Sequence, residues 1–417
     1  MRVILISLLL LISGQSFAQV YIEKQSRHRF AQLNLGIDFN SSFGGSSQYI
    51  NSLGNVESLE LSHLQKPRIV IGGTHFWGHA DFYIAIPLFS PAFDSQNQKV
   101  FYDTGVETVF KYYPLRIEHN KIRPFAGFSI APFYFEHKNN STTFGNGPEL
   151  NHTSLALISG ITFLRKNQLF EIGLLWNYSN TKDYFISRNL VREIETPPLY
   201  LNVSYRIMLE TTLSAEKSWE SGHSKKLSET LSLDGFFVGL GMSSAFWIKE
   251  SKYNQVNRPY ISRYSTSIMP DFAIGYYFHN TDINITANFR GYSTSTYTYG
   301  ANQVASRRSF GLEATKFLFD YHGFVPIIGP IVSTETLRFQ ESFERNLTLY
   351  ITENKLAYGI TFGWDIRPNR IQSFILRTSL RWYPNLELEE PGGSTVAFDN
   401  IEFNFIQLIV YLNRFFG

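Results

Sequence analysis

Alternation of apolar and polar residues with a period of two is the feature that most constrains this chain. The stretches 170–179, 199–210 and 356–366 all show it. In the first of them one face carries Phe170, Ile172, Leu174, Trp176 and Tyr178. Successive side chains point to opposite faces only in an extended strand. The pattern therefore predicts β-strands with one bulky apolar face and one small or polar face.

Sixteen strands can be placed along the chain by this pattern. Many exceed about ten residues, which is the length of a tilted strand that crosses a membrane. The predicted strand cores are 30–40, 67–75, 80–90, 101–115, 122–137, 152–165, 168–179, 198–211, 235–248, 266–279, 282–298, 306–320, 323–341, 353–366, 372–386 and 398–414.

The connections between these strands alternate in length. The short links are 77–79, 165–167, 279–281 and 367–370. The longer polar links are 41–66, 139–151, 180–196 and 250–265. An up-and-down membrane barrel has this asymmetry, because its periplasmic turns are short and its surface loops are long. The fold class predicted is all-β, a transmembrane antiparallel up-and-down β-barrel of about 16 strands.

The N-terminal residues indicate export. Arg2 precedes an apolar run over 3–12, and Ser16-Phe17-Ala18 has the small-x-small pattern of a cleavage site, so a signal peptide is predicted over 1–18. The remaining chain has no uninterrupted apolar stretch of about 18 residues, so a transmembrane helix is not expected. The chain can therefore enter a membrane only as strands, and the cell outer membrane is its predicted location.

Composition narrows the function classes. The chain contains 37 Phe, 24 Tyr and 6 Trp, and membrane barrels place such residues at both lipid interfaces. A formal net charge of +2 gives no basic field for nucleic acid, so no nucleic-acid partner is expected. The absence of Cys from the sequence excludes a disulfide scaffold, a zinc-thiolate site and a Cys nucleophile.

An internal repeat is predicted from ordered matches about 200 residues apart. It divides the chain into two related halves, 19–212 and 234–417, joined by a periplasmic linker over 213–233. The matched segments are Pro67–Gly72 with Pro270–Gly275, Gly105–Thr108 with Gly311–Ala314, Pro124–Gly127 with Pro326–Gly329, and Gly160–Phe163 with Gly359–Phe362.

Three segments carry a family resemblance: 111–115, 122–128, and 160–178 with its turn Arg165-Lys166-Asn167. On these residues each half resembles the eight-stranded outer-membrane β-barrel proteins common in Bacteroidetes-type bacteria, which are similar in architecture to the OmpA/OmpX type. The second half departs from the first of these segments, with Lys316 to Asp320 in place of a Tyr-Tyr-Pro sequence. The resemblance implies a fold, and it brings no catalytic or ligand motif with it.

Two architectures are compatible with this sequence. One barrel of sixteen strands would pair strand eight with strand nine. Two barrels in tandem would pair strand eight with strand one and strand sixteen with strand nine. The long polar link 213–233 is unnecessary for a single barrel and can bridge two barrels as a coil, so it favours the tandem arrangement.

Charged residues at predicted lumen-facing positions are the candidate site. They could form a charged constriction that selects solutes, or they could pair and fill a narrow lumen, because an unpaired buried charge is costly. Pairing is favoured for eight strands, and a constriction for sixteen. The candidates are Glu171, Arg206, Arg290, Glu313, Asp365, Arg377 and Arg381.

The predicted function is a non-enzymatic structural, anchoring or surface-binding role. The alternative is a porin-like passive channel for small solutes, if the halves close into one wide barrel, and an outer-membrane enzyme ranks third. Histidines such as His63, His79 and His152 are scattered over different predicted loops and rims without a catalytic spacing, so no catalytic, cofactor or metal site is predicted. The expected partners are outer-membrane lipid and surface or periplasmic proteins.

Overall fold

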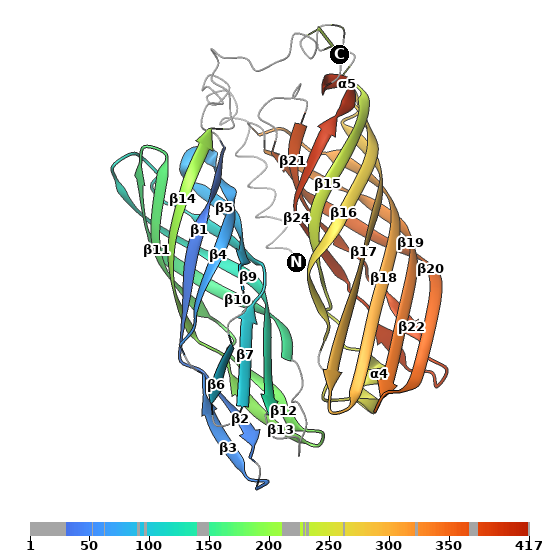
Figure 1. Ribbon diagram of the computed structural model, residues 1–417. Coiled ribbons are helices and arrows are strands. Elements are labelled where there is room, and N and C mark those ends of the chain that lie inside the picture. Colours follow the sequence, from blue (N-terminus) through green and yellow to red (C-terminus); the bar gives the residue numbers. More distant parts are fainter. Residues whose placement is uncertain are drawn as a thin grey trace, which may run out of the picture.

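The chain forms two β-barrels that lie side by side in a computed structural model (Figure 1). The predicted signal peptide, 1–18, and most of the predicted linker, 213–233, lie outside the described residues. The structure describes residues 31–51, 53–61, 63–89, 92–95, 98–139, 150–210, 226–227, 230, 233–261, 263–321, 324–366 and 374–415.

The first barrel closes through eight antiparallel strands of the N-terminal half. The last strand of the ring pairs with the first, for example Ile207 with Leu35. In ring order the strands are β1 (Gln32–Phe43), β4 (Gln65–His75), β5 (Ala80–Pro87), β8 (Glu107–Tyr112), β9 (Ile122–Asn139), β10 (Leu150–Arg165), β11 (Gln168–Asn177) and β14 (Leu199–Glu210).

The second barrel closes in the same way from the C-terminal half. Its last strand pairs with its first, for example Leu408 with Leu240, and the short helix α5 (Leu412–Phe415) follows. In ring order the strands are β15 (Gly235–Phe246), β16 (Ser265–Phe278), β17 (Ile283–Thr298), β18 (Ala301–Phe317), β19 (Phe324–Phe343), β20 (Asn346–Ile366), β21 (Phe374–Trp382) and β24 (Ile401–Tyr411).

The pairing of strand ends decides between the two architectures. β14 returns to β1 and β24 returns to β15, so the prediction of two tandem eight-stranded barrels is confirmed and the single sixteen-stranded barrel is not formed. The segments matched between the halves lie on or beside equivalent strands, namely β4 and β16, β8 and β18, β9 and β19, and β10 and β20. The duplication itself stays a prediction.

The outer faces of both barrels are apolar, as the alternation predicts. Along β11 every second residue is exposed, with Ile172 and Trp176 each about half exposed, and the alternate residues are buried. Leu240 and Phe272 are equally exposed on the second barrel. Exposed apolar bands around closed barrels meet lipid, because closure leaves no unpaired strand edge in the hydrocarbon. Both barrels are therefore transmembrane, and the protein resides in the outer membrane.

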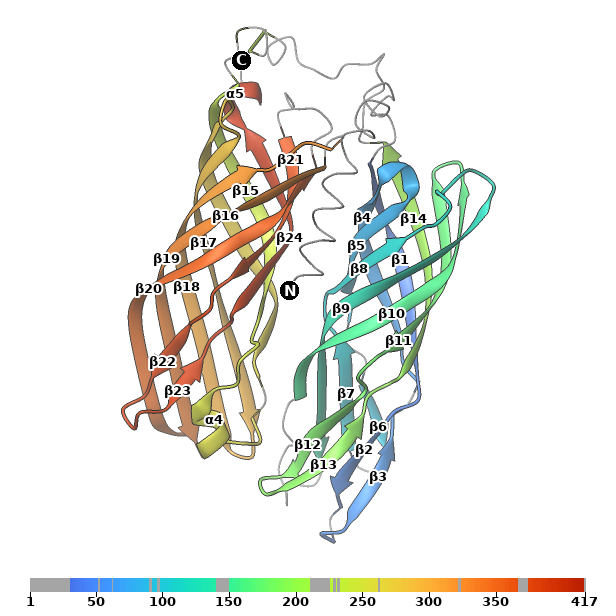
Figure 2. The same ribbon diagram turned by 180° about the vertical axis from the view of Figure 1, so that it is seen from behind.

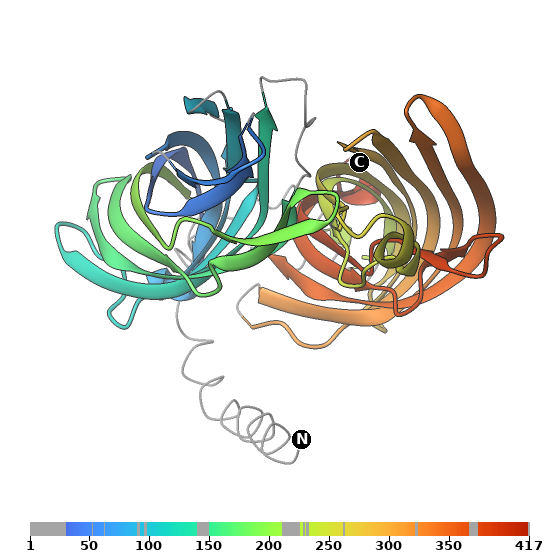
Figure 3. The ribbon, with the colours of Figure 1, turned by 90° about the horizontal axis from the view of Figure 1, so that it is seen from below.

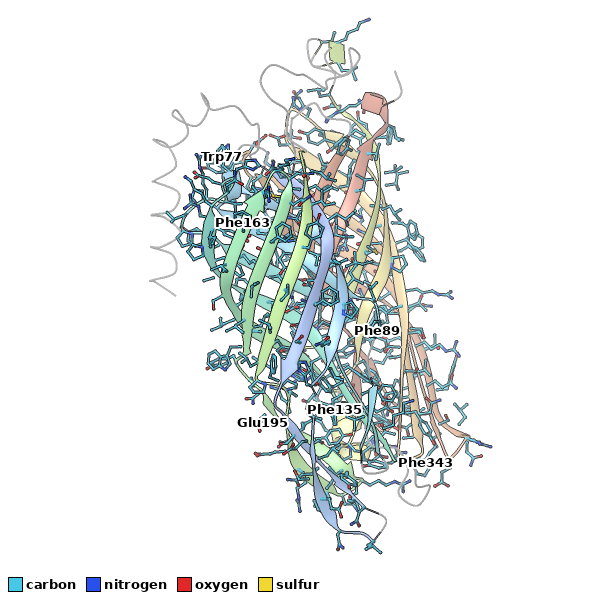
Figure 4. The ribbon with its side chains drawn as sticks, turned by 60° about the vertical axis from the view of Figure 1, so that its left-hand side comes forward. Trp77, Phe89, Phe135, Phe163, Glu195 and Phe343 are labelled. Carbon is cyan, nitrogen blue, oxygen red and sulfur yellow. The ribbon has the colours of Figure 1, made fainter. Side chains whose placement is uncertain are left out.

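The two ends of the barrels differ. The 3-10 turn η1 (Phe76–Gly78) lies at the same end of the first barrel as Gln32, where β1 begins, and Glu210, where β14 ends. Short turns mark the periplasmic end of such barrels, so this end is periplasmic. Figure 4 labels Trp77 at this end, with Glu195 and Phe343 at the opposite, extracellular end. The predicted links 41–66 and 180–196 start from the extracellular end.

The sequence pattern predicted these two links as long polar connections and did not indicate the strands within them. They contain four short strands, which form a separate sheet in the order β12-β13-β2-β3. Their alternation is too short to stand out in the sequence, yet it buries Tyr49, Tyr184 and Ile194 in one cluster. The strands are β2 (Ser46–Ile50), β3 (Val56–Glu60), β12 (Thr181–Ser187) and β13 (Leu190–Glu195).

Other predicted elements change at their extracellular ends. The predicted strand 101–115 is broken, because β7 ends at Thr104 and β8 begins at Glu107. Figure 2 shows a helix and a hairpin at this end of the second barrel. These additional elements are β6 (Ala92–Ser95), β7 (Gln98–Thr104), α4 (Lys252–Asn257), β22 (Glu387–Glu389) and β23 (Thr395–Ala397).

Two prolines occupy spanning strands, where they cannot donate to the ladder. Opposite Pro132, the strand beside β9 has one extra residue between Thr104 and Thr108, which is a β-bulge. At Pro330 the pairing of β19 with β18 is interrupted without a change of register. Both barrels therefore accept proline by giving up local pairing on one side.

Candidate functional site: filled lumens and a cavity between the barrel ends

One charged cluster crosses the lumen of the first barrel near Arg68 on β4. Its guanidinium donates from Nε to Asp38 Oδ1 and from Nη2 to Asp38 Oδ2, both at 2.7 Å, and it also pairs with Glu107. Asn202 Nδ2 on β14 donates to Asp38 Oδ2 at 3.0 Å. All four side chains are almost fully buried. The cluster therefore links four strands of the ring through its interior.

A second cluster in the same lumen surrounds Glu171 on β11. Its carboxylate accepts from Lys111 Nζ at 2.8 Å and from the Tyr113 hydroxyl at 2.6 Å, and it pairs with Arg206. The Nη1 atom of Arg206 lies 2.8 Å from Asp81 Oδ2. Bidentate and multiply bonded ion pairs of this kind satisfy the charges that a dry lumen would otherwise leave unpaired.

The lumen of the second barrel contains one larger network around Arg307 on β18. Arg307 donates to both oxygens of Glu335, at 2.7 and 2.8 Å, and its Nη1 atom lies 2.5 Å from Asp399 Oδ2 and 2.7 Å from Glu402 Oε1. Arg290 on β17 also pairs with Glu402. The strand β24 is a ring neighbour of neither β17 nor β18, so the contacts of Arg290 and Arg307 with Glu402 pass directly across the lumen.

Arg381 on β21 extends this network toward the periplasmic side. Its Nε atom lies 2.6 Å from Glu313 Oε1, and its Nη1 atom lies 2.5 Å from Asp271 Oδ2 and 3.7 Å from Glu402 Oε2. Arg377 forms a separate bidentate pair with Asp365, at 2.7 and 3.0 Å. Each guanidinium thus faces at least one carboxylate.

The seven predicted lumen residues are all buried inside the two barrels, none more than 4% exposed. The structure brings Glu171 together with Arg206, Glu313 with Arg381, and Asp365 with Arg377. The alternation could have identified most of the further members, because all of them except Asp399 occupy inward positions on strands. The residues that sequence reasoning missed are Asp38, Arg68, Asp81, Glu107, Lys111, Asp271, Arg307, Glu335, Asp399 and Glu402.

The extracellular ends of the barrels touch through one hairpin, β12–β13. Figure 3 shows this hairpin of the first barrel reaching the second barrel. At its tip Arg188 Nη2 donates to the Tyr299 carbonyl at 2.6 Å, and the Arg188 guanidinium lies 5.2 Å from the ring centre of Phe343. The Tyr299 hydroxyl donates back to the Phe185 carbonyl at 3.3 Å. We call these contacts the clasp.

A cavity of about 530 Å³ lies beside the clasp, with walls from both barrels. A smaller space of about 200 Å³ shares five of its lining residues; we call the two together the inter-barrel cavity and the smaller one its annex. The first barrel supplies His152, Lys182, Asp183, Tyr184 and Phe185, and the second supplies Trp247, Lys249, Glu250, Tyr260, Arg263 and Tyr264, among others.

Two cations of the cavity, Arg263 and Lys182, have only weak protein partners. Arg263 Nη2 lies 3.1 Å from Glu250 Oε1, and both side chains are about half exposed. Hydrogen bonds from Gln255 and Arg263 hold the pKa of Glu250 below its usual value. Lys182 Nζ donates to Ser179 Oγ at 2.8 Å. Exposed ion pairs contribute little stability, so these cations can serve another anion.

Among the residues that the structure describes, no group of three or more His, Asp or Glu side chains is placed to hold a metal ion. Within the same ranges, no helix is long and apolar enough to cross a membrane. The expectations that the protein is not an enzyme and binds no cofactor stay predictions.

The fold defines this chain as an outer-membrane β-barrel protein. No protein-family model and no curated protein matches the chain. Among solved structures it is similar to an outer-membrane channel from Pseudomonas putida F1, with 8% identity, a TM-score of 0.21, and coverage of 91% of this chain and 95% of that chain.

Two further solved structures give weaker alignments. The Ralstonia pickettii toluene transporter TbuX has 7% identity and a TM-score of 0.19, with coverage of 92% of this chain and 90% of that chain. A porin has 9% identity and a TM-score of 0.14, with coverage of 89% and 99%. Scores this low do not assign a shared fold or function, so the proposals that follow rest on the geometry of this chain.

Proposed function

We propose that this protein is a non-enzymatic outer-membrane anchor, in which two filled barrels hold a binding surface outside the cell. The observation that carries the proposal is the set of ion pairs across each lumen, such as Arg307 with Glu335 and Asp399. Eight strands leave an interior just wide enough for side chains to fill, whereas sixteen leave an aqueous channel. The two closed rings of eight strands therefore favour occlusion.

The energetics of the lumen support the same role. Removing one partner of a buried ion pair costs about 3–5 kcal/mol, because the remaining charge is left without compensation. A permeating ion or solute would have to separate several such pairs in series, for example Arg381 from Glu313 and Asp271. Passage at rates useful for nutrition is therefore not expected through either barrel in this state.

Passive transport is the second candidate. The solved structures named above are described as a channel, a toluene transporter and a porin, but their TM-scores lend this candidate no weight here. A porin-like channel was predicted only if the two halves closed into one wide barrel. The halves instead close into two separate rings of eight strands. A channel would thus have to open within an eight-stranded ring or along the line between the barrels.

The finer assignments are part of the same proposal. Each half belongs, on this proposal, to the eight-stranded outer-membrane barrel proteins of Bacteroidetes-type bacteria that the sequence resembles. The chain arose by duplication of one such barrel. Its partners are outer-membrane lipid around the apolar bands and surface or periplasmic proteins at the two ends. The extracellular sheet β12-β13-β2-β3 supports a surface role, because loops on a rigid scaffold are where binding residues concentrate.

Planar-bilayer recording tests the proposal. The purified full chain, shown to be folded by heat-modifiable migration in gels, should give little or no conductance, while a general porin inserted in the same bilayer gives stable openings. Stable openings of porin size from the full chain would overturn the proposal. If Arg377→Glu or Arg381→Glu also changed their ion selectivity, passive transport through the second lumen would become the function.

A further inference from the structure

We propose that the inter-barrel cavity binds a ring-bearing organic anion, with its acidic group in the annex and its ring against the aromatic wall. The inference deepens the proposed surface-binding role and rests on it. Its basis is a juxtaposition that neither barrel has alone: cations from both barrels and a histidine without a described hydrogen-bond partner line one cavity together with aromatic rings.

The annex selects charge. Among the described residues that line it, Lys182 comes from the first barrel and Arg263 from the second, and none is acidic. Each cation has a surface partner, Ser179 for Lys182 and Glu250 for Arg263, and both partners sit in water where they contribute little. A carboxylate or phosphate between the two cations would gain charge-assisted hydrogen bonds in a more enclosed place.

His152 adds a neutral polar group at the same point. Both of its ring nitrogens are buried and have no hydrogen-bond partner among the described residues. Its ring packs on Phe133 with centroids 5.0 Å apart, which fixes its orientation. A buried polar atom left unpaired costs free energy, so a ligand hydroxyl that bonds to one of these nitrogens would recover that loss.

The larger part of the cavity selects shape. Its walls include Tyr184 and Phe185 from the first barrel and Trp247, Tyr260 and Tyr264 from the second. The Trp247 indole N–H already donates to the Ala397 carbonyl at 3.1 Å, so this residue offers its ring and not its donor. Aromatic faces favour flat or ring-shaped apolar surfaces. A volume of about 530 Å³ lies within the ordinary range for small-molecule sites.

The shared chemistry, an acidic group on a ring, fits an acidic sugar or an aromatic acid, and the experiment separates these sources. Binding to the full chain in detergent is measured by calorimetry and by ligand-observed NMR, with glucuronate and benzoate as probes. Glucose and benzyl alcohol are the neutral counterparts. We expect at least one acid to bind saturably below about 10 mM, well ahead of its neutral counterpart, since one ion pair and one stacked ring supply millimolar affinity.

Substitutions locate the binding. Lys182→Ala and Arg263→Ala should each weaken the bound acid roughly tenfold, as loss of one charge-assisted contact predicts. Arg192→Ala is the matched control, because Arg192 carries the same charge on the same hairpin and does not line the cavity. His152→Phe should weaken glucuronate more than benzoate, because only the sugar brings hydroxyl groups.

Three outcomes would overturn the inference: no saturable binding of either acid, equal binding of acid and neutral counterpart, or binding that Lys182→Ala and Arg263→Ala leave unchanged. These outcomes are separable from failure of the proposed function. A silent bilayer with no acid bound removes this inference alone, whereas a conducting protein that binds the acid removes the anchoring role alone.

Discussion

The first and second barrels fill equally narrow lumens with differently connected charges. In the first barrel Arg68 and Arg206 anchor two clusters with separate carboxylates. In the second barrel Glu402 is shared by Arg290, Arg307 and Arg381, so one network runs through the lumen. A shared carboxylate makes each arginine depend on the others, so the second barrel should respond more strongly to loss of a single charge.

The two barrels also differ in how their extracellular ends are built. The second barrel extends its own spanning strands, since β19 and β20 have 20 and 21 residues. The first barrel has shorter spanning strands, such as β11 with 10 residues, and builds a separate sheet above them. The first barrel therefore supplies the arm of the clasp, and the second barrel supplies the rigid hairpins that receive it.

Loss of Arg307 should have the largest effect. Arg307→Met leaves Glu335, Asp399 and Glu402 without this partner, and we expect a loss of about 3–5 kcal/mol in the free energy of unfolding of the second barrel only. Urea titration with limited proteolysis, followed by mass spectrometry of each half, would measure this. Arg308→Met is the control, because the next residue on β18 points outward and is exposed. Equal loss in both barrels would show that they do not unfold independently.

The lumen shows what the sequence could predict and what it could not. Period-two alternation assigns each residue to a face, so inward positions such as Arg290 and Asp365 follow from the strand alone. The partners do not follow, because Arg290 meets Glu402 across 112 positions and Arg381 meets Asp271 across 110. Which strands face each other depends on ring closure, and two closures were compatible with the same strands.

The extracellular region was less predictable for a different reason. The strands β2 and β3 have 5 residues each, too few for a period to be distinguished from a polar loop. Their sheet also depends on packing between links far apart in the chain, such as Glu195 against Ser46. The clasp and the inter-barrel cavity depend in turn on that sheet, so sequence patterns did not indicate them.

Removal of the clasp should have a smaller effect. Arg188→Ala removes the bond to the Tyr299 carbonyl and the contact with Phe343. Because Arg188 is exposed, we expect the coupling between the barrels to fall by only about 1 kcal/mol. A double-mutant cycle with Phe343→Ala, read from the unfolding midpoints, measures the coupling. Arg192→Ala on the same hairpin should show no coupling energy with Phe343→Ala. If Arg188→Ala gave no more coupling than this control, the clasp would not hold the two barrels together.

Substitutions in the hairpin turns of the second barrel should change its stability by a similar or smaller amount, and one of them should increase it. Its long hairpins close through two-residue turns in the left-handed region, Tyr299-Gly300 and Glu344-Arg345, with φ of 72° at Arg345. A side chain in this region costs about 1 kcal/mol, a cost that glycine avoids. Arg345→Gly should therefore stabilise the second barrel slightly, and Gly300→Ala should destabilise it. Thermal unfolding would test both signs, and destabilisation by Arg345→Gly would contradict the argument.

The smallest effect concerns the periplasmic turns that precede β9 and β19. In the first barrel Glu118 accepts from Lys121, Arg116 and Arg123, which lowers its pKa to about 2. In the second barrel Tyr321 and Phe324 instead pack on Phe76 of the first, with ring centroids 5.9 and 5.6 Å apart.

A carboxyl group whose pKa is lower in the folded than in the unfolded state stabilises the fold at every pH above the ordinary glutamate pKa. Glu118 loses this contribution as the pH falls toward about 2. Stability of the first barrel should therefore decline over this acidic window, and Glu118→Gln should flatten the decline. The group is exposed, so salt should reduce the difference further. A wild-type profile that Glu118→Gln leaves unchanged at low salt would show that these hydrogen bonds do not order the turn.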